Sequence, residues 1–281
     1  MQKSNDKKKI FPNQTQSPPG LEYKMDPLPV YDDSLSGSNL LLGKKCIITG
    51  GDSGIGRAIA VAFAKEGADV VIIHLEEEQK DADETIEFIK DHFNKTCLSI
   101  AIDITIEKKC KLAVQEIAEK FKRIDILVNN AGVHFPEATI EDIKTPNLIK
   151  TFTVNVFAMF WITQAVLPHM PKGGSIINTA SVTGYRGSGG LLDYSATKGA
   201  IVSFTRSLSA NLMDRGIRVN GVAPGPVWTP LIPSSFPADK VSKFGTDSPM
   251  KRPGQPVEIA GAYVFLASEK SSYISGQFIH I

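Results

Sequence analysis

From about Lys44 onward, short runs of β-branched residues alternate with amphipathic helical stretches, and this alternation constrains the fold more than any other feature of the chain. It is typical of βαβ units, whose parallel strands form one sheet with helices on both faces. The predicted strands are 46–49, 70–74, 98–102, 126–129, 175–179, 218–223 and 277–281. The predicted helices are 55–66, 79–92, 107–121, 145–170, 194–213 and 256–267. We therefore expect an α/β protein with a doubly wound, seven-stranded parallel sheet in a single domain.

Two segments depart from this alternation. Residues 1–40 are rich in Asn, Gln, Ser and Pro without helical or strand periodicity, so we expect an arm that is disordered in its first half. Its second half carries apolar side chains that could lie extended on the body, and a tail without function is the alternative. Prolines recur between Pro224 and Pro253, and we interpret residues 226–253 as a lid on the substrate side of the main domain, residues 41–281, with a plain surface loop as the alternative.

Charge and composition exclude several classes of partner. The formal net charge is +1, so nothing favours nucleic acid or an anionic membrane, and we expect a small-molecule substrate. We identify no signal peptide and no stretch of roughly 18 uncharged apolar residues, and we predict a cytoplasmic protein. Cys46, Cys97 and Cys110 form no CxxC pair, as expected of reduced thiols. The histidines have no zinc-binding spacing, and no catalytic metal is predicted.

A glycine-rich segment, Thr49 to Gly56, lies between the first predicted strand and the first helix. In that position Gly50, Gly54 and Gly56 are typical of the turn of a Rossmann-type fold that binds the pyrophosphate of a dinucleotide, because the helix start supplies N–H groups and a positive dipole. An ordinary strand-to-helix turn is the alternative. A P-loop would need GK[ST], but Arg57 follows Gly56, which disfavours a kinase or ATPase.

Tyr194 and Lys198 are separated by one helical turn, so a helix would present the phenol and the ammonium on one face. Hydride transfer from an alcohol needs a base for the hydroxyl proton, and the reverse reaction needs an acid. We expect Lys198 to lower the pKa of Tyr194 from about 10 toward neutrality, a preference for the phenolate of about 4 kcal/mol. A packed aromatic beside a solvated lysine is the alternative.

Over about residues 41–281 the chain resembles the short-chain dehydrogenase/reductase family. The resemblance rests on TGGDSGIG at 49–56, Asp103, the run Asn129 to Gly132, Asn155, Ser181, the YSATK run from Tyr194 to Lys198, and Pro224-Gly225. It implies that residues 41–281 form the dehydrogenase domain of an NAD(P)-dependent oxidoreductase that interconverts an alcohol and a carbonyl, with Asn155, Ser181, Tyr194 and Lys198 as catalytic residues. Ser181 would bind the substrate oxygen and Asn155 would hold a water chain from the lysine.

The resemblance also implies a set of cofactor contacts. Asp103 would meet the adenine ring, although it could instead cap the next helix, and Thr229 would meet the carboxamide of the nicotinamide. The full predicted set is Gly50, Asp52, Ser53, Gly54, Ile55, Gly56, His74, Leu75, Glu76, Asp103, Ile104, Asn130, Ala131, Gly132, Tyr194, Lys198, Pro224, Gly225, Val227 and Thr229.

The choice between NAD and NADP depends on the residues after the second predicted strand. In register with the family, the deciding positions are His74 and Leu75, which are neither the acid typical of NAD nor the arginine typical of NADP. Glu76, Glu77 and Glu78 follow and should repel a 2′-phosphate, so we predict NAD. A solvated helix start is the other reading of these glutamates.

The resemblance further implies a homotetramer packed through the helices that carry Thr151 and Tyr194. Their apolar side chains Phe157, Phe160, Trp161, Phe204 and Leu208 could equally face the core. An NAD(H)-binding sensor with little turnover is a second hypothesis for function. A serine hydrolase would need a GxSxG elbow, which we do not find. Sugars, steroids, quinones and keto-esters all remain possible substrates.

Overall fold

The computed structural model describes residues 8–281 and contains one seven-stranded sheet in which all the strands are parallel. The strand order is β3-β2-β1-β4-β5-β6-β7. The strands are β1 (Lys45–Thr49), β2 (Asp69–His74), β3 (Cys97–Ala101), β4 (Ile126–Asn129), β5 (Ser175–Thr179), β6 (Arg218–Ala223) and β7 (Phe278–His280). The predicted fold class is confirmed.

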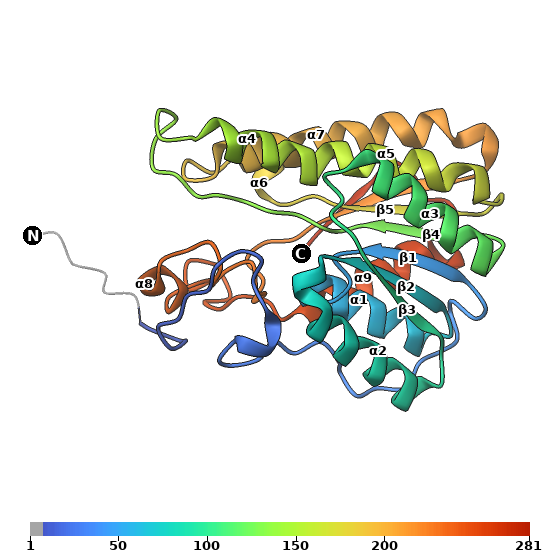
Figure 1. Cartoon of the computed structure of the whole chain (residues 1–281), viewed down its shortest axis with the longest axis horizontal. Helices are drawn as coiled ribbons and strands as arrows, with labels where there is room; N and C mark the ends of the chain where they lie inside the picture. Colours follow the sequence, from blue (N-terminus) through green and yellow to red (C-terminus); the bar gives the residue numbers. More distant parts are fainter. Residues whose placement is uncertain (1–7) are drawn as a thin grey trace, which may run out of the picture.

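Helices cover both faces of the sheet (Figure 1). One face carries α3 (Glu107–Phe121), α4 (Thr145–Phe152), α5 (Ala158–Val166) and α7 (Leu192–Asn211), and the other carries α1 (Gly54–Lys65), α2 (Gln79–Phe93) and α9 (Pro256–Ala267). Shorter helices are α6 (Thr183–Arg186) and α8 (Ala238–Val241). Single turns are η1 (Glu22–Lys24), η2 (Glu76–Glu78), η4 (Leu167–His169), η5 (Met213–Arg215) and η6 (Glu269–Ser271).

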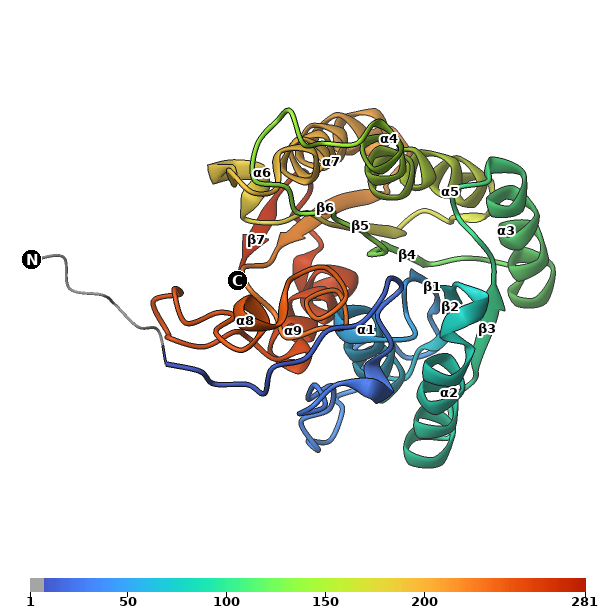
Figure 2. The ribbon, with the colours of Figure 1, turned by 60° about the vertical axis from the view of Figure 1, so that its left-hand side comes forward.

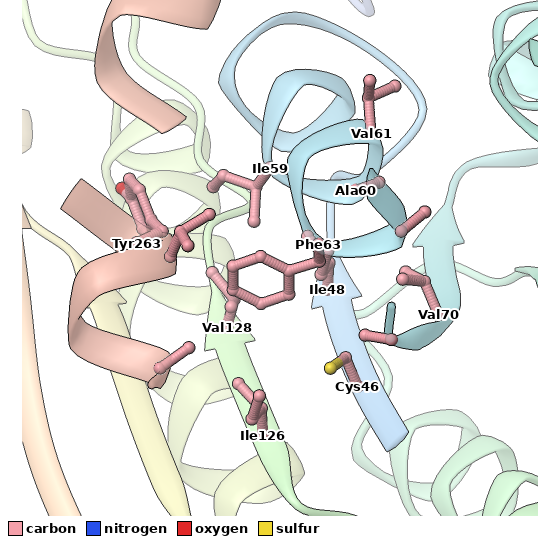
Figure 3. Packing of buried hydrophobic residues seen from close by; sticks show 14 of the residues in the cluster. Cys46, Ile48, Ile59, Ala60, Val61, Phe63, Val70, Ile126, Val128 and Tyr263 are labelled. Carbon is pink, nitrogen blue, oxygen red and sulfur yellow. The ribbon is translucent and has the colours of Figure 1, made fainter. Parts of the chain in front are cut away.

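The central strands are buried on both faces, which explains their continuous apolar runs. Successive residues of β1 point to opposite faces: Ile48 packs in the core beneath α1 and α9, and Ile47 packs in the core beneath α3 and α5. Figure 3 shows the first core, where Phe63 of α1 lies beside Ile48 and Tyr263 of α9 belongs to the same cluster. These two cores hold the carboxyl ends of β1, β4 and β5 in fixed relative positions.

The predicted helix 145–170 is interrupted by a π-helical segment, η3 (Thr153–Phe157), between α4 and α5. By length and mean hydropathy the whole stretch Thr145–His169 could cross a membrane, a possibility that we did not recognise in the sequence. Half of its apolar window is buried inside the domain, and a core helix passes the same test. The high hydropathy is explained by the packing of this stretch against the sheet and α3.

The arm and the lid lie side by side in both views of the molecule (Figures 1 and 2). The expectation of disorder in the first half of the arm fails for residues 8–20: Ile10 N–H donates to Ser242 O at 2.8 Å and Gln16 N–H donates to Pro233 O at 2.7 Å. The polar composition predicted disorder, but these hydrogen bonds are made by backbone groups, which every residue type carries. Phe11 also stacks on Trp228 of the lid, with ring centroids 3.8 Å apart. The prediction for residues 1–7 lies outside the described residues.

Candidate functional site

The glycine-rich turn joins β1 to α1 and has the geometry of an anion cradle. Gly50 and Gly54 adopt left-handed φ angles of +62° and +52°. At Gly56, a Cβ would lie 1.7 Å from Gly50 O, so only glycine fits there. The predicted contacts Asp52, Ser53 and Ile55 lie in this turn or in the first turn of α1.

The loop after β4 is fastened to this turn by hydrogen bonds. Thr49 Oγ1 accepts from the N–H groups of Asn130 at 2.9 Å and Ala131 at 3.0 Å, and Asn130 Nδ2 donates to Gly50 O at 3.2 Å. The structure therefore brings Asn130, Ala131 and Gly132 next to the glycine turn. This is the crevice outside the carboxyl ends of the strands, where open α/β sheets bind ligands.

Two buried polar atoms near the turn have no hydrogen-bond partner within residues 8–281: Asp52 Oδ2 and His74 Nε2. Burial raises the pKa of Asp52, a shift opposed by a hydrogen bond with Ser53 and by the charge of His74. Buried polar groups are normally paired, so partnerless ones beside a turn in which only glycine fits at one position suit a polar ligand. These features fit the adenosine end of a dinucleotide.

The three glutamates after β2 do not form a uniform acidic surface. Glu76 and Glu77 are exposed, but Glu78 Oε2 turns back and accepts from Leu75 N–H at 2.9 Å. Burial, with a smaller contribution from Asp52, raises the pKa of Glu78 to about 8. A raised pKa makes the negative charge of Glu78 less favourable, which weakens the electrostatic argument for NAD.

Asp103 follows β3 at the edge of the sheet, and its side chain closes a local turn. Asp103 Oδ1 accepts from Thr105 N–H at 2.9 Å and from Thr105 Oγ1 at 2.7 Å. Residue Ile106, not Asp103, occupies the N-cap of α3, so the helix-cap alternative does not describe this aspartate. The next predicted contact, Ile104, is buried in the core beneath α3.

The start of the lid reaches the glycine turn. A Cβ at Gly54 would lie 3.0 Å from Thr229 Cγ2. Val227 pairs with Gly254 through a parallel bridge, and Gly225 N–H donates to Ile281 O at 2.6 Å. The predicted contacts Pro224, Gly225, Val227 and Thr229 therefore enclose the same region from the β6 side.

Tyr194 and Lys198 lie on one face of α7, as their spacing predicted. Lys198 Nζ is 5.3 Å from the centroid of the Tyr194 ring and donates to Thr179 O at 2.8 Å. Burial raises the pKa of Tyr194 to about 12, against the effect of a hydrogen bond with Ser181. Burial also lowers the pKa of Lys198 to about 7.

The pKa of Tyr194 therefore shifts in the direction opposite to our expectation. Our expectation counted the attraction of the phenolate to nearby positive charge, but burial in a low-dielectric site penalises the charged forms of both groups. In the protein alone, desolvation is the larger effect. Lys198 can consequently exchange a proton near neutral pH.

Ser181 and Asn155 complete the predicted catalytic set. Ser181 is buried just beyond β5, and its Oγ accepts from Thr183 N–H at 3.2 Å. Asn155 lies in the π-helical segment, where Oδ1 accepts from Val133 N–H at 2.8 Å and Nδ2 donates to Val133 O at 3.0 Å. Such π segments often mark functional positions in helices. A Cβ at Gly132 would lie 3.4 Å from Asn155 Oδ1 and 3.6 Å from Lys198 Nζ, so these two groups flank one small space.

Sequence reasoning missed His134, which is buried between Tyr194 and the lid. Its ring contacts the Tyr194 ring edge-on at 5.2 Å, and its Nε2 lies 2.6 Å from Ser235 Oγ. Burial lowers the pKa of His134 to about 4, so the imidazole is neutral. In the sequence, its position two residues after Gly132, a predicted cofactor contact, could have indicated that His134 lies near the site. Glu22, which contacts the glycine turn from the arm, had no such signal.

Comparisons with known proteins agree with this arrangement. A family model described as enoyl-(acyl carrier protein) reductase matches residues 50–281. The uncharacterized oxidoreductase YhxC of Bacillus subtilis is 56% identical over 279 residues, 99% of this chain and 97% of the relative. NADPH-dependent aldehyde reductase 1, chloroplastic, of Arabidopsis thaliana is 49% identical over 93% of both chains. The glucose and ribitol dehydrogenase of Daucus carota is 51% identical over 96% of this chain and 95% of the relative.

Two solved structures share the fold at 30% sequence identity. One is a short-chain dehydrogenase from Burkholderia cenocepacia in complex with NADP, with a TM-score of 0.79 over 86% of this chain and 97% of that one. The other is the L-sorbose reductase of Gluconobacter frateurii complexed with NADPH and L-sorbose, with a TM-score of 0.77 over 85% and 95%. The chain therefore belongs to the short-chain dehydrogenase/reductase family, the NAD(P)-dependent oxidoreductases that interconvert alcohols and carbonyls by hydride transfer.

Proposed function

We propose that this protein is an NADP(H)-dependent reductase or dehydrogenase of small aldehydes, sugars or sugar alcohols, with Tyr194 as general acid and base. The observation that carries the proposal is that Tyr194, its hydrogen-bond partner Ser181 and Lys198 lie together, with Ser181 and Lys198 buried and Lys198 on the same face of α7 as the phenol. A phenol that already accepts or donates a hydrogen bond beside an ammonium is placed to exchange a proton with a substrate hydroxyl.

The other catalytic roles follow from charge. Ser181 Oγ would hold the substrate oxygen and stabilise the negative charge that develops there. Lys198, whose pKa is lowered to about 7 by burial, would relay the proton and favour the phenolate while it is charged. A bound oxidised nicotinamide would supply the hydride acceptor, and its positive charge before the transfer would favour the phenolate of Tyr194.

A path for the proton is supported by the space beside Gly132. Asn155 and Lys198 flank it, and Asn155 is clamped to the backbone of Val133, so its amide has a fixed orientation. A cavity of about 10 Å³ lined by Asn155, Thr49 and Thr179 lies nearby, which is close to the smallest volume that holds one water. We propose that water in this region carries the proton away from Lys198.

We propose NADP(H) in place of the NAD predicted from the sequence. The support is that the two solved relatives are complexed with NADP or NADPH and that one sequence relative is an NADPH-dependent reductase. The raised pKa of Glu78 weakens one of the repulsions on which the NAD prediction rested. The substrate class is likewise supported by the activities named for the relatives.

Titration with NADPH and NADH, followed by nicotinamide fluorescence, tests the cofactor. We expect NADPH to bind at least tenfold more tightly, and a tighter NADH complex would contradict the proposed choice. Binding of a nicotinamide without turnover of any aldehyde, ketose or polyol would instead favour a sensor.

Tyr194→Phe tests the chemistry. The variant keeps the ring that packs on His134 but lacks the proton, so kcat should fall about 10²- to 10⁴-fold. The Kd for NADPH, measured by the same titration, should stay within about threefold. Full turnover by this variant would refute Tyr194 as the general acid and base.

We further propose a cytoplasmic homotetramer. The tetramer is supported by the partial exposure of Phe157 on η3 and Phe160 on α5, with the Phe160 ring 4.3 Å from the ring of Phe204 of α7. The cytoplasmic location is supported by the three buried cysteines, which are free thiols. Light scattering should give four times the chain mass, and a monomer mass would refute the tetramer.

A further inference from the structure

The arm places a buried carboxylate on the glycine-rich turn. Glu22, in the single turn η1, is 1% exposed, and its Oε2 accepts from Gly54 N–H at 2.5 Å. Its other oxygen, Oε1, lies 2.9 Å from Arg57 Nη1 in the first turn of α1. One side chain of the arm therefore contacts both the backbone of the turn and the helix that the turn opens.

Arg57 joins this contact to the rest of the domain. Its Nε donates to Asp52 O at 2.8 Å and its Nη2 donates to Asp81 O at 2.7 Å. The Asp81 carboxylate in turn accepts from the N–H groups of Glu22 at 2.8 Å and Tyr23 at 3.1 Å. Because each partner is held by another, the Glu22 carboxylate has little freedom to move away from Gly54.

The lid holds the arm on both sides of Glu22. A Cβ at Gly20 would lie 2.1 Å from Pro230 O, so the arm passes directly against the lid there. After Glu22, Trp228 Nε1 donates to Pro27 O at 2.9 Å. Figure 2 shows the arm running between the lid and α1. The arm is thus built into the structure at the point where it meets the turn.

The turn needs such a partner. Gly54 has a left-handed φ and is the first residue of α1, where the N–H groups have no acceptor within the helix. An acceptor fixed by the arm selects one conformation of the turn before any ligand arrives. A ligand that binds only this conformation then loses less affinity to the ordering of the turn. The guanidinium of Arg57 offsets the negative charge that Glu22 brings to an anion site.

We propose that Glu22 is a positioning residue of the cofactor site, through which the N-terminal arm sets the conformation of the glycine-rich turn and hence the affinity for the dinucleotide. The inference rests on the proposed binding of the cofactor at this turn. The role belongs to the carboxylate oxygen as a hydrogen-bond acceptor, and Glu22 itself takes no part in hydride transfer.

The test compares Glu22→Ala and Glu22→Gln with wild-type protein. NADPH is titrated by fluorescence at a temperature at which thermal unfolding shows every protein to be folded. Glu22→Ala should raise the Kd and the KM for NADPH at least tenfold with kcat within twofold at saturating cofactor. Glu22→Gln, which keeps an acceptor for Gly54 N–H, should stay within about threefold of wild type.

Asp33→Ala is the matched control. Asp33 is also a carboxylate of the arm and is paired with a basic residue of α1, Lys65, but at the far end of the helix from the turn. Its loss should leave the Kd for NADPH within twofold of wild type. If Glu22→Ala does not fold, Glu22→Asp replaces it, since the shorter side chain withdraws the acceptor but keeps a charge for Arg57.

The outcomes separate this inference from the proposed function. A wild-type protein that binds neither NADPH nor NADH would overturn both. Normal binding by wild type with an unchanged Kd in folded Glu22→Ala would overturn only the role of Glu22. Tighter binding by Glu22→Ala would mean that the arm obstructs the site, and equal losses in the Ala and Gln variants would mean that charge acts in place of the acceptor; either result overturns the inference.

Discussion

Lys198 and Arg57 are equally buried cations in one domain, each 3% exposed, but their surroundings are opposite. Arg57 has carboxylate oxygens of Glu22, Asp81 and Glu84 within 3.7 Å. Lys198 has no ion pair within residues 8–281, and its ammonium donates to a backbone carbonyl. The comparison teaches that carboxylates can offset the desolvation of one buried cation, whereas another cation without an ion pair bears that desolvation alone.

The chemistry of the two side chains suits this difference. A guanidinium stays protonated and offers several fixed donors, so Arg57 can join the arm, the turn and α2 permanently. An ammonium loses its proton readily in a dry site, so Lys198 is available for proton transfer. We infer that the paired cation maintains the structure and that the unpaired one is kept for function at a cost in stability.

Removing the paired cation should give the largest effect on stability. Arg57→Met leaves Glu22 and Asp81 buried without their partner, so the free energy of unfolding should fall by about 3–5 kcal/mol. Urea unfolding at pH 7 measures this, with Arg57→Lys as the control that keeps a charge. A loss below about 1 kcal/mol would show that the two cations are not as different as proposed.

Removing Lys198, the cation without an ion pair, should relieve a loss of folding stability that depends on pH. The pKa of Lys198 is lowered from 10.5 to about 7, so between these values the unfolded chain binds a proton that the folded one does not. This group therefore makes wild type more stable as pH rises, by up to about 3 kcal/mol from pH 6 to pH 9. Lys198→Met should lack this pH dependence, and its free energy of unfolding should exceed that of wild type by the largest margin at pH 6.

The measurement is urea unfolding of both proteins at several pH values. A constant difference between the two curves would contradict the lowered pKa. Turnover of Lys198→Met should be lost at every pH, which separates the stabilising effect of the substitution from its effect on activity.

An effect of opposite sign and similar size is expected at Glu22. Burial raises its pKa from 4.5 to about 7, against the effect of Arg57. The folded state therefore holds a proton that the unfolded state has released, and stability present below pH 4.5 is lost as pH rises through 7. Glu22→Gln should reduce this loss by up to about 1.4 kcal/mol per pH unit.

The stability of Glu22→Gln should still fall as pH rises, because the pKa values of Asp52 and Glu78 are raised by burial as well. Unfolding curves of wild type and Glu22→Gln at pH 5, 6, 7 and 8 test the prediction. Parallel pH dependences would contradict a titrating Glu22.

The smallest effect is expected for an exposed pair. Asp33 is about half exposed where it meets Lys65, so solvent screens the charges, and Asp33→Ala should change the free energy of unfolding by less than about 1 kcal/mol. High salt should abolish even that difference. A larger loss would show that the arm depends on this contact as well as on the buried one at Glu22.

The parts of the site that the sequence revealed are those encoded locally. Every predicted strand agrees with the structure to within a residue or two, because β-branched runs between turns are a short-range signal. The same holds for the glycine turn and for Tyr194 and Lys198, whose relation depends on one turn of helix. What failed was long-range: Glu22 is 32 residues from Gly54, and His134 is 101 residues from Ser235.

By itself, then, the sequence determined the order of strands and helices, the cradle after the first strand and the pairing of a phenol with an amine on one helical face. Only the tertiary structure decided that the amine is buried without an ion pair among residues 8–281, that the pKa of the phenol rises, and that a proline-rich arm supplies an acceptor to the turn. The physical reason is that propensity and periodicity act over a few residues, whereas desolvation and ion pairing depend on which distant segments the fold packs together.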